Sequence, residues 1–430
     1  HYPAQGQSDR VELLGADVWL PRYFEGQLVT AYALLETRCG LTTRRFTSIV
    51  FMGTRALADA VRVFATAIPI ALIIGPVMPR QYLMPTAILV LGFLTVLYTY
   101  KGGMRAVVWT ELLQAAVYVA GGISAIVLLG KASTGGWSGI LQQAGAAGKL
   151  QLLDFSTALD KPHTIFAGLI GGAFLSMASH GADQLIVQRL LSARSLKDAQ
   201  RAIIGSGLVV FVQFALFLTV GVGLWSFYQG RVFDTPDAIF PSFIVERMPT
   251  GLLGLIVAAI VAATMSTHSG AINALAATTT HDIYMPLTGR KAEDPHTFKM
   301  GRRFALVWGV VLTLGALLFP EGRTPVVVIA LSIASFTYGA LLGGFFLGIL
   351  VKRARQRDAI IGMCVGLTSM AVVVFAKLLE AAVPILVPVL HPIDSIAWPW
   401  YVLIGTTITV LTGMLSSLSH SSDGSRGATT

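Results

Sequence analysis

Long apolar stretches set the main constraint on how this chain can fold. A helix needs about 20 predominantly apolar residues to cross a bilayer. Only 12% of the 430 residues are charged, against about 25% in soluble domains. We therefore predict an all-α polytopic membrane protein with about ten transmembrane helices. The expected spans are roughly residues 46–76, 84–100, 105–130, 163–182, 203–228, 251–281, 302–320, 325–351, 359–388 and 397–418.

Basic residues are distributed unevenly between the loops. If the loop before the first span is cytoplasmic, the inside loops and the C-terminal tail hold 20 Lys and Arg residues, and the outside loops hold 8. Basic loops favour the cytoplasmic side of a membrane. We expect a multi-pass protein of the plasma membrane, or of the inner membrane in a bacterium, with a cytoplasmic C-terminus. The same loops account for the net charge of +9 without nucleic acid as a partner.

Three regions follow from this pattern. Residues 1–45 are expected to hold an N-terminal remnant and, over 21–45, a weakly amphipathic cytoplasmic surface helix. Residues 46–418 form the transmembrane domain. Residues 419–430 are rich in Ser and Gly, which predicts a disordered cytoplasmic tail.

Ionisable residues inside two of the spans need an explanation, because charge in a membrane is costly. Arg55, Asp59 and Arg62 lie four and three residues apart, on one helical face, so Asp59 can pair with both arginines. A structural ion-pair cluster is the favoured interpretation, and a transport role stays open. Glu111, just inside the third span, either caps a helix N-terminus or takes part in coupling.

The fourth and sixth spans are unusually polar. Glycines interrupt the fourth span, which predicts either close helix packing or a broken helix that presents backbone groups to a ligand. In the sixth span, Ala263, Ser266, Thr267 and Gly270 share one helical face. Hydroxyl and carbonyl oxygens suit an alkali cation, although hydrogen bonding between helices is the alternative. We find no zinc, paired-carboxylate or nucleophile–base pattern and expect no enzyme.

The sixth span contains AATMSTHSGAINALAATTTHDIY, which resembles the signature of the sodium/solute symporter family, the relatives of the sodium–glucose cotransporters. The resemblance runs from about residue 21 to 418. Other segments agree with that family in the same order: TAYALLETRCG, TRALADAVRVFATAI, YTYKGGMRAVVWTELLQ, GADQLIVQRLLSARSLKDAQR and SFTYGALLGGFFLGIL.

The resemblance implies an inverted five-helix repeat with two broken helices, and sodium-driven symport by alternating access. It also implies a sodium site made by the Ala263 carbonyl with the Ser266 and Thr267 hydroxyls. A possible second sodium site joins Glu111 to Ser269, with Gly270 standing where a further hydroxyl would be. The implied substrate contacts are Ser176, Ser179 and His180, with Gln213 and Ser335 from neighbouring spans.

The ten spans match the family's core helices from the third onward, so the fold is expected to lack its first helices. We expect the chain as given not to transport, and its intact parent to do so. The solute could be a sugar, polyol, sugar acid, amino acid or vitamin. The alternative is a non-transporting solute- or sodium-binding sensor or regulatory membrane protein of the same fold. The sequence leaves the oligomeric state open.

Overall fold

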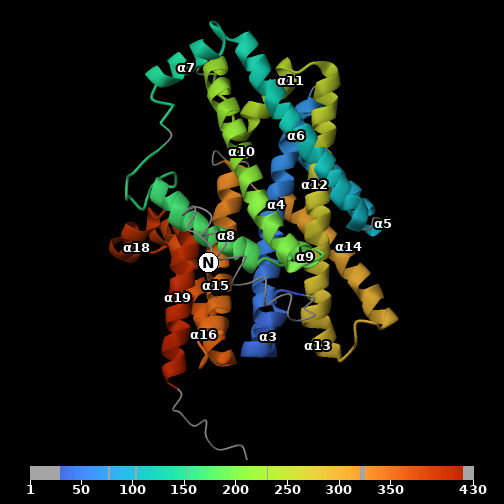
Figure 1. The fold of residues 1–430 in the computed structure, drawn as a ribbon, viewed down its shortest axis with the longest axis vertical. Helices are drawn as coiled ribbons and strands as arrows, with labels where there is room; N and C mark the ends of the chain where they lie inside the picture. Colours follow the sequence, from blue (N-terminus) through green and yellow to red (C-terminus); the bar gives the residue numbers. More distant parts are fainter. Residues whose placement is uncertain are drawn as a thin grey trace, which may run out of the picture.

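The computed structural model describes residues 30–75, 78–101, 104–151, 153–229, 231–319 and 325–419, and within them every element is helical (Figure 1). Nine of the described helices are long and apolar enough to cross a membrane. The predicted all-α polytopic architecture is therefore confirmed. The long helices are α4 (Leu41–Ile74), α5 (Arg80–Lys101), α6 (Met104–Ala132), α10 (Leu196–Tyr228), α12 (Thr250–Thr278), α14 (Pro295–Leu317), α15 (Val326–Leu350), α16 (Gln356–Val374) and α19 (Trp400–Leu418).

Short helices join these long ones. The ends of α3, α13, α16 and α19 lie toward one end of the molecule, and α7 and α11 lie at the other (Figure 1). The short α-helices are α3 (Ala33–Cys39), α7 (Gly136–Ala146), α8 (Gly172–Gly181), α9 (Gln184–Leu191), α11 (Ile239–Arg247), α13 (Met285–Thr288), α17 (Ala376–Ala382) and α18 (Val387–Asp394). The remaining turns are π-helical at Ala167–Gly171 and Thr279–Tyr284, and 3₁₀-helical at Pro236–Ala238 and Pro384–Leu386.

The fourth expected span, 163–182, is not one long helix, which is why nine long helices appear rather than ten. It consists of the π turn followed by α8, and the chain then becomes extended at Asp183 (φ −86°, ψ 116°) before α9 begins. The Asp183 carboxylate caps α9 by accepting a hydrogen bond of 2.8 Å from the Leu185 N–H. The sequence had left a broken helix open for this span, and the break lies at its end.

Two other boundaries differ from the prediction. The first long helix begins at Leu41, directly after Gly40, whose φ of +86° turns the chain between α3 and α4. A Cβ at Gly40 would lie 2.4 Å from Gln356 Oε1, so both space and backbone require glycine there. In place of the ninth expected span, 359–388, α16 ends at Val374, and α17 and α18 follow it.

The segment expected to form a surface helix over 21–45 is described from residue 30. Tyr32 and Leu35 are almost fully buried, and Tyr32 packs against Phe51 and Phe345. The described part of this segment therefore contributes to the core rather than lying on a surface, because its aromatic side chain fills a space between α4 and α15. Residues 1–29 and 420–430 lie outside the described residues.

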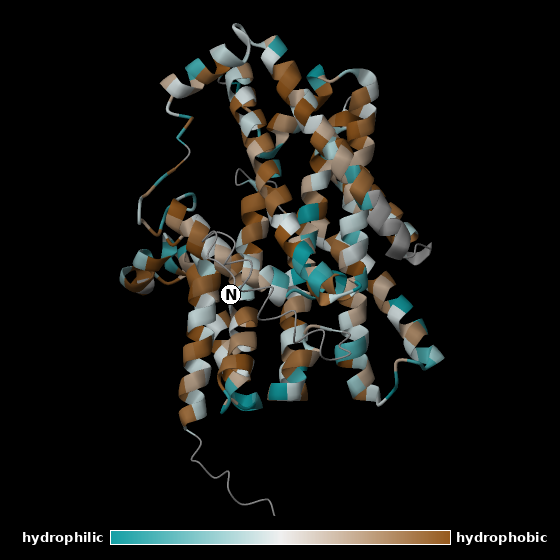
Figure 2. Ribbon diagram, viewed as in Figure 1, coloured by the Kyte–Doolittle hydropathy of each residue, from teal (hydrophilic) through white to brown (hydrophobic). Residues whose placement is uncertain are grey.

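Hydrophobic residues predominate along the long helices, while hydrophilic residues gather at helix ends and around α9 (Figure 2). On α10, Leu208 and Phe211 are 68% and 73% exposed, which suits a surface that faces lipid. At the other side, α15, α16 and α19 pack closely through small residues. Between these regions α12 contacts α4, α5, α6 and α14, so its polar residues lie at the centre of the helix bundle.

Candidate functional site

One turn of α12 brings the three predicted sodium ligands together. The Thr267 hydroxyl donates a hydrogen bond of 3.0 Å to the Ala263 carbonyl oxygen, so these two oxygens are adjacent. Ser266, 3% exposed, donates a hydrogen bond of 2.8 Å from its hydroxyl to Glu111 Oε1 on α6. Three neutral oxygens and one carboxylate are hard ligands of the kind that an alkali cation prefers. Whether they bind sodium stays a prediction.

Glu111 has two described partners, and neither is the predicted one. Its Oε1 accepts from Ser266 and also from Arg189 NH2 on α9 at 2.9 Å. Gly270 lies beside this contact: a Cβ there would be 3.3 Å from Arg189 NH2, a tight approach. Ser269 is buried, and no contact among the described residues joins it to Glu111. The structure thus links the two proposed sodium sites, because Ser266 of the first donates to Glu111 of the second. It also places the positively charged guanidinium of Arg189 beside them.

A cavity of about 770 Å³ adjoins this turn, between α6, α10, α11 and α12. We call it the α12 cavity. Of the predicted site residues, it brings together Glu111 with Gln213, Ala263 and Thr267. Its apolar walls include Phe217. Further lining residues are Gln114, Tyr118, Arg189, Phe240, Ile256, Ile260 and Thr264.

The other predicted substrate contacts do not line the α12 cavity. On α8, His180 Nδ1 lies 3.0 Å from the Ser176 carbonyl oxygen and 3.0 Å from the Ser179 hydroxyl. These three residues therefore contact one another beside the helix break. Ser335, on α15, is fully buried and its hydroxyl has no hydrogen-bond partner in the described structure. Their roles in substrate binding stay predictions.

A buried ion cluster lies on the opposite side of α12. Asp59 Oδ1 is 4.0 Å from Arg55 NH2 and 3.6 Å from Arg62 NH1, which confirms the predicted pairing along α4. The sequence did not predict that His268 would join it: its Nδ1 forms a short contact with Asp59 Oδ2. Asp59 is fully buried and His268 is 1% exposed.

The same cluster extends to the helix break. The Tyr338 hydroxyl on α15 donates a short hydrogen bond to Asp183 Oδ2, and Arg55 NH1 lies 4.0 Å from the same oxygen. Asp183 therefore caps α9 while it is held by α15 and α4. Atoms of Arg55, Asp59 and His268 are buried without a hydrogen-bond partner in the described structure, so the cluster is only partly satisfied. Tyr338 was missed because a Tyr within an apolar span indicates packing alone.

A bundle of membrane-spanning helices with a shorter broken helix, and with oxygens gathered on one turn of α12, is typical of a secondary transporter fold. The model of the sodium:solute symporter family matches residues 16–366. The chain belongs to this family, and the resemblance drawn from its sixth span is confirmed.

Known proteins agree with this assignment. The sodium-coupled monocarboxylate transporter 2 of Mus musculus is 26% identical over 82% of this chain and 57% of its own length. The sodium/sialic acid symporter of Proteus mirabilis is 28% identical over 81% of this chain and 70% of its own length. A solved structure of a Na⁺-coupled sialic acid symporter, substrate-bound and outward-open, matches with a TM-score of 0.76 and 24% identity. That match covers 96% of this chain and 83% of the other, and shows a shared fold.

Proposed function

We propose that the protein containing this chain is a sodium-coupled symporter of a small organic solute that works by alternating access. One observation carries the proposal: the oxygens of Ala263, Ser266 and Thr267 lie together on one turn of α12, next to the α12 cavity. The chain spans little more than half of the monocarboxylate transporter's length, so the activity is proposed for the protein as a whole. The names of the relatives, which specify sodium coupling, support it.

Sodium binding would act first on this turn. In the structure the Thr267 hydroxyl is hydrogen-bonded to the Ala263 carbonyl, and an ion placed between both oxygens would replace that bond. A neutral hydroxyl and a carbonyl each supply an oxygen lone pair to a cation. The Ser266 hydroxyl already donates its proton to Glu111, which leaves its oxygen lone pairs available to a cation. We infer that Glu111 and Ser269 form a second sodium site, because a carboxylate and a hydroxyl are also hard oxygen ligands.

Coupling follows from thermodynamic linkage. Sodium that binds more tightly to the outward-facing state increases the population of that state, and with it the affinity for solute. The membrane potential adds about 2.3 kcal/mol, for each elementary charge and each 100 mV, to the free energy that drives sodium inward. The distribution of basic loops supports a plasma or bacterial inner membrane location with the C-terminus in the cytoplasm.

An organic acid is the solute class best supported. Two relatives are named for acids, monocarboxylates and sialic acid. The α12 cavity offers the Arg189 guanidinium, the Gln213 amide and the Tyr118 hydroxyl, which can all donate to a carboxylate or hydroxyl. Ser176, Ser179, His180 and Ser335 remain proposed contacts from the broken helix and from α15.

Uptake into liposomes tests the proposal. The protein containing this chain is reconstituted, and uptake of a labelled monocarboxylate and of sialic acid is measured with an inward gradient of sodium or of choline. We expect sodium alone to drive accumulation. Ser266→Ala and Thr267→Ala should each raise the sodium concentration for half-maximal uptake by about tenfold, which corresponds to about 1.4 kcal/mol.

Thr368→Ala is the matched control. Like Thr267, Thr368 donates to a carbonyl four residues earlier, but it is exposed on α16 and far along the chain from α12. Its sodium dependence should equal that of the wild type. Equal accumulation in choline, or a T267A variant that behaves like T368A, would contradict the proposal. Sodium-dependent solute binding without flux would instead indicate a sensor.

A further inference from the structure

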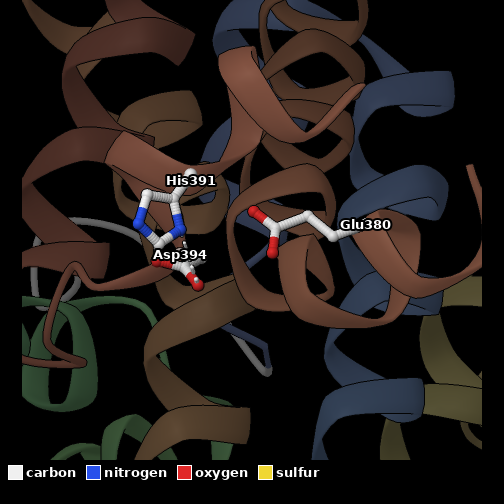
Figure 3. A group of neighbouring side chains, drawn as sticks. All are labelled: Glu380, His391 and Asp394. Atoms are coloured by element: carbon white, nitrogen blue, oxygen red, sulfur yellow. Dashed lines mark ion pairs between the residues drawn. The ribbon is translucent and has the colours of Figure 1, made fainter. Parts of the chain in front are cut away.

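A cluster of possible metal ligands lies away from the α12 cavity, in the connection between α16 and α19. We propose that Glu380 on α17, with His391 and Asp394 on α18, forms a binding site for a divalent transition metal of the Zn²⁺ class (Figure 3). The site does not depend on the proposed symport, because none of its three residues lines the α12 cavity.

The geometry places one ligand atom of each residue within reach of a single ion. These atoms, one from each of the three side chains, all lie within 4.8 Å of one another. His391 Nδ1 is 4.0 Å from Asp394 Oδ2, since the two residues are three apart and share one face of α18. The Glu380 carboxylate points toward this pair from α17 (Figure 3).

The separation is close to what a metal requires. Zinc bonds of about 2.0–2.2 Å place tetrahedral ligands about 3.4 Å from one another. Side-chain rotations that bring the three ligand atoms closer by up to about 1.4 Å, the difference between 4.8 and 3.4 Å, would therefore complete the shell, with a water or another ligand in the fourth position. Pro384, Pro388 and Pro392 restrict the backbone between and within the two short helices.

An independent observation points to a missing ligand. Glu380 Oε1 is buried and has no hydrogen-bond partner in the described structure. A buried carboxylate oxygen without a partner is costly, and a second carboxylate nearby adds repulsion. A bound cation removes both costs. The Asp394 side chain is 11% exposed whereas that of His391 is 75% exposed, so an ion can reach the partly buried carboxylates past the exposed imidazole.

The ligand types select the metal. Mg²⁺ and Ca²⁺ prefer shells of oxygen alone, whereas one imidazole nitrogen with carboxylate oxygens suits Zn²⁺ and its first-row neighbours. Since Glu380 and the pair on α18 come from different helices, the ion would join α17 to α18. We expect bound metal to stabilise this connection between α16 and α19.

Calorimetric titration with Zn²⁺ tests the site. The 430-residue chain is purified in detergent without a histidine tag, stripped of metal with EDTA, and titrated. We expect about one Zn²⁺ per chain, bound saturably, and a higher unfolding temperature with the metal. His391→Ala and Glu380→Gln should each weaken the binding by at least about tenfold. Mg²⁺ and Ca²⁺ should not compete at equal concentration.

His163→Ala is the control, because His163 is an exposed histidine outside the cluster. It should bind Zn²⁺ like the wild type. A cooperative unfolding transition measured without metal shows whether H391A and E380Q are folded. A variant that shows no such transition is replaced by Asp394→Asn. The proposal is overturned if the wild type binds no Zn²⁺ saturably, or if H391A, E380Q and H163A bind it equally.

Discussion

Two consecutive residues of α12 lie in opposite environments. Thr267 borders the α12 cavity together with Glu111, whereas His268 contacts the fully buried Asp59. One residue along an α-helix turns the side chain by about 100°, so a single helix can serve both sides. On the side of the α12 cavity, polar groups can exchange their hydrogen-bond partners. On the side of His268 and Asp59, the polar groups are held between helices.

The two sides differ in how their charges are compensated. The ion pair on the cavity side joins side chains that are 32% exposed at Glu111 and 45% exposed at Arg189. Water screens such a pair, so a cation could replace either interaction at little cost. The Asp59 side chain has no exposure and that of Arg55, 4.0 Å away, is 8% exposed, whereas Arg62, 3.6 Å from Asp59, is 42% exposed. Asp59 and Arg55, which have almost no exposure, therefore depend on each other and on the buried groups around them.

The buried side also fastens the helix break. Through Tyr338 and Arg55, the extended residue Asp183 is connected to α15 and α4. The break between α8 and α9 is therefore anchored to helices on the other side of the bundle from the α12 cavity. A movement of α8 or α9 that reached the cavity would have to change these contacts as well.

The largest effect is expected from Asp59→Asn. It removes the negative charge that lies between Arg55 and Arg62, and breaking a buried pair in this way costs about 3–5 kcal/mol. We expect the free energy of unfolding in mixed micelles to fall by that amount. Asp160→Asn, at an exposed loop position, is the control and should change it by less than about 0.5 kcal/mol. Similar values for both variants would mean that the buried cluster contributes little.

Tyr338→Phe should have an intermediate effect. It leaves the aromatic ring in place and removes the hydroxyl that donates to Asp183, a hydrogen bond to a charged group worth about 1.5–3 kcal/mol. Because the Asp183 oxygen keeps the more distant Arg55, we expect the lower half of that range. Amide hydrogen exchange should rise in α8 and α9 more than in α16. Tyr82→Phe, at an exposed tyrosine, controls for the loss of a hydroxyl. If Y82F raised amide hydrogen exchange in α8 and α9 as much as Y338F, the anchoring role of Tyr338 would be contradicted.

Much of the fold could be predicted from the sequence, because hydropathy and length alone determine which segments can cross a membrane. The break at Asp183 could not be located, since an Asp following a Gly–Ala pair is equally suited to ending a helix at the interface. The pairing along α4 was predictable because its partners are four and three residues apart. The contacts of Asp59 with His268 and of Asp183 with Tyr338 were not, since they join residues more than 150 positions apart.

The candidate site shows the same limit. Glu111 and Ser266 were each predicted, but as members of two different sodium sites, because helical spacing groups residues within one helix and cannot align two helices. Arg189 was not among the predicted site residues. Its contact with Glu111 depends on the break that brings α9 toward α12. That break is not visible in the residue itself.

The smallest change in stability is expected from Glu111→Gln, and it tests the comparison most sharply. The pair with Arg189 is partly exposed, so its loss should lower the free energy of unfolding by less than about 1 kcal/mol. Gln keeps an oxygen that can accept from Ser266, so the local fold should persist. If Glu111 serves sodium, E111Q should still weaken the sodium dependence of uptake, while Arg189→Gln should not weaken it. A stability loss as large as that of D59N would show that the cavity side is as fixed as the buried side, and the distinction between Thr267 and His268 would fail.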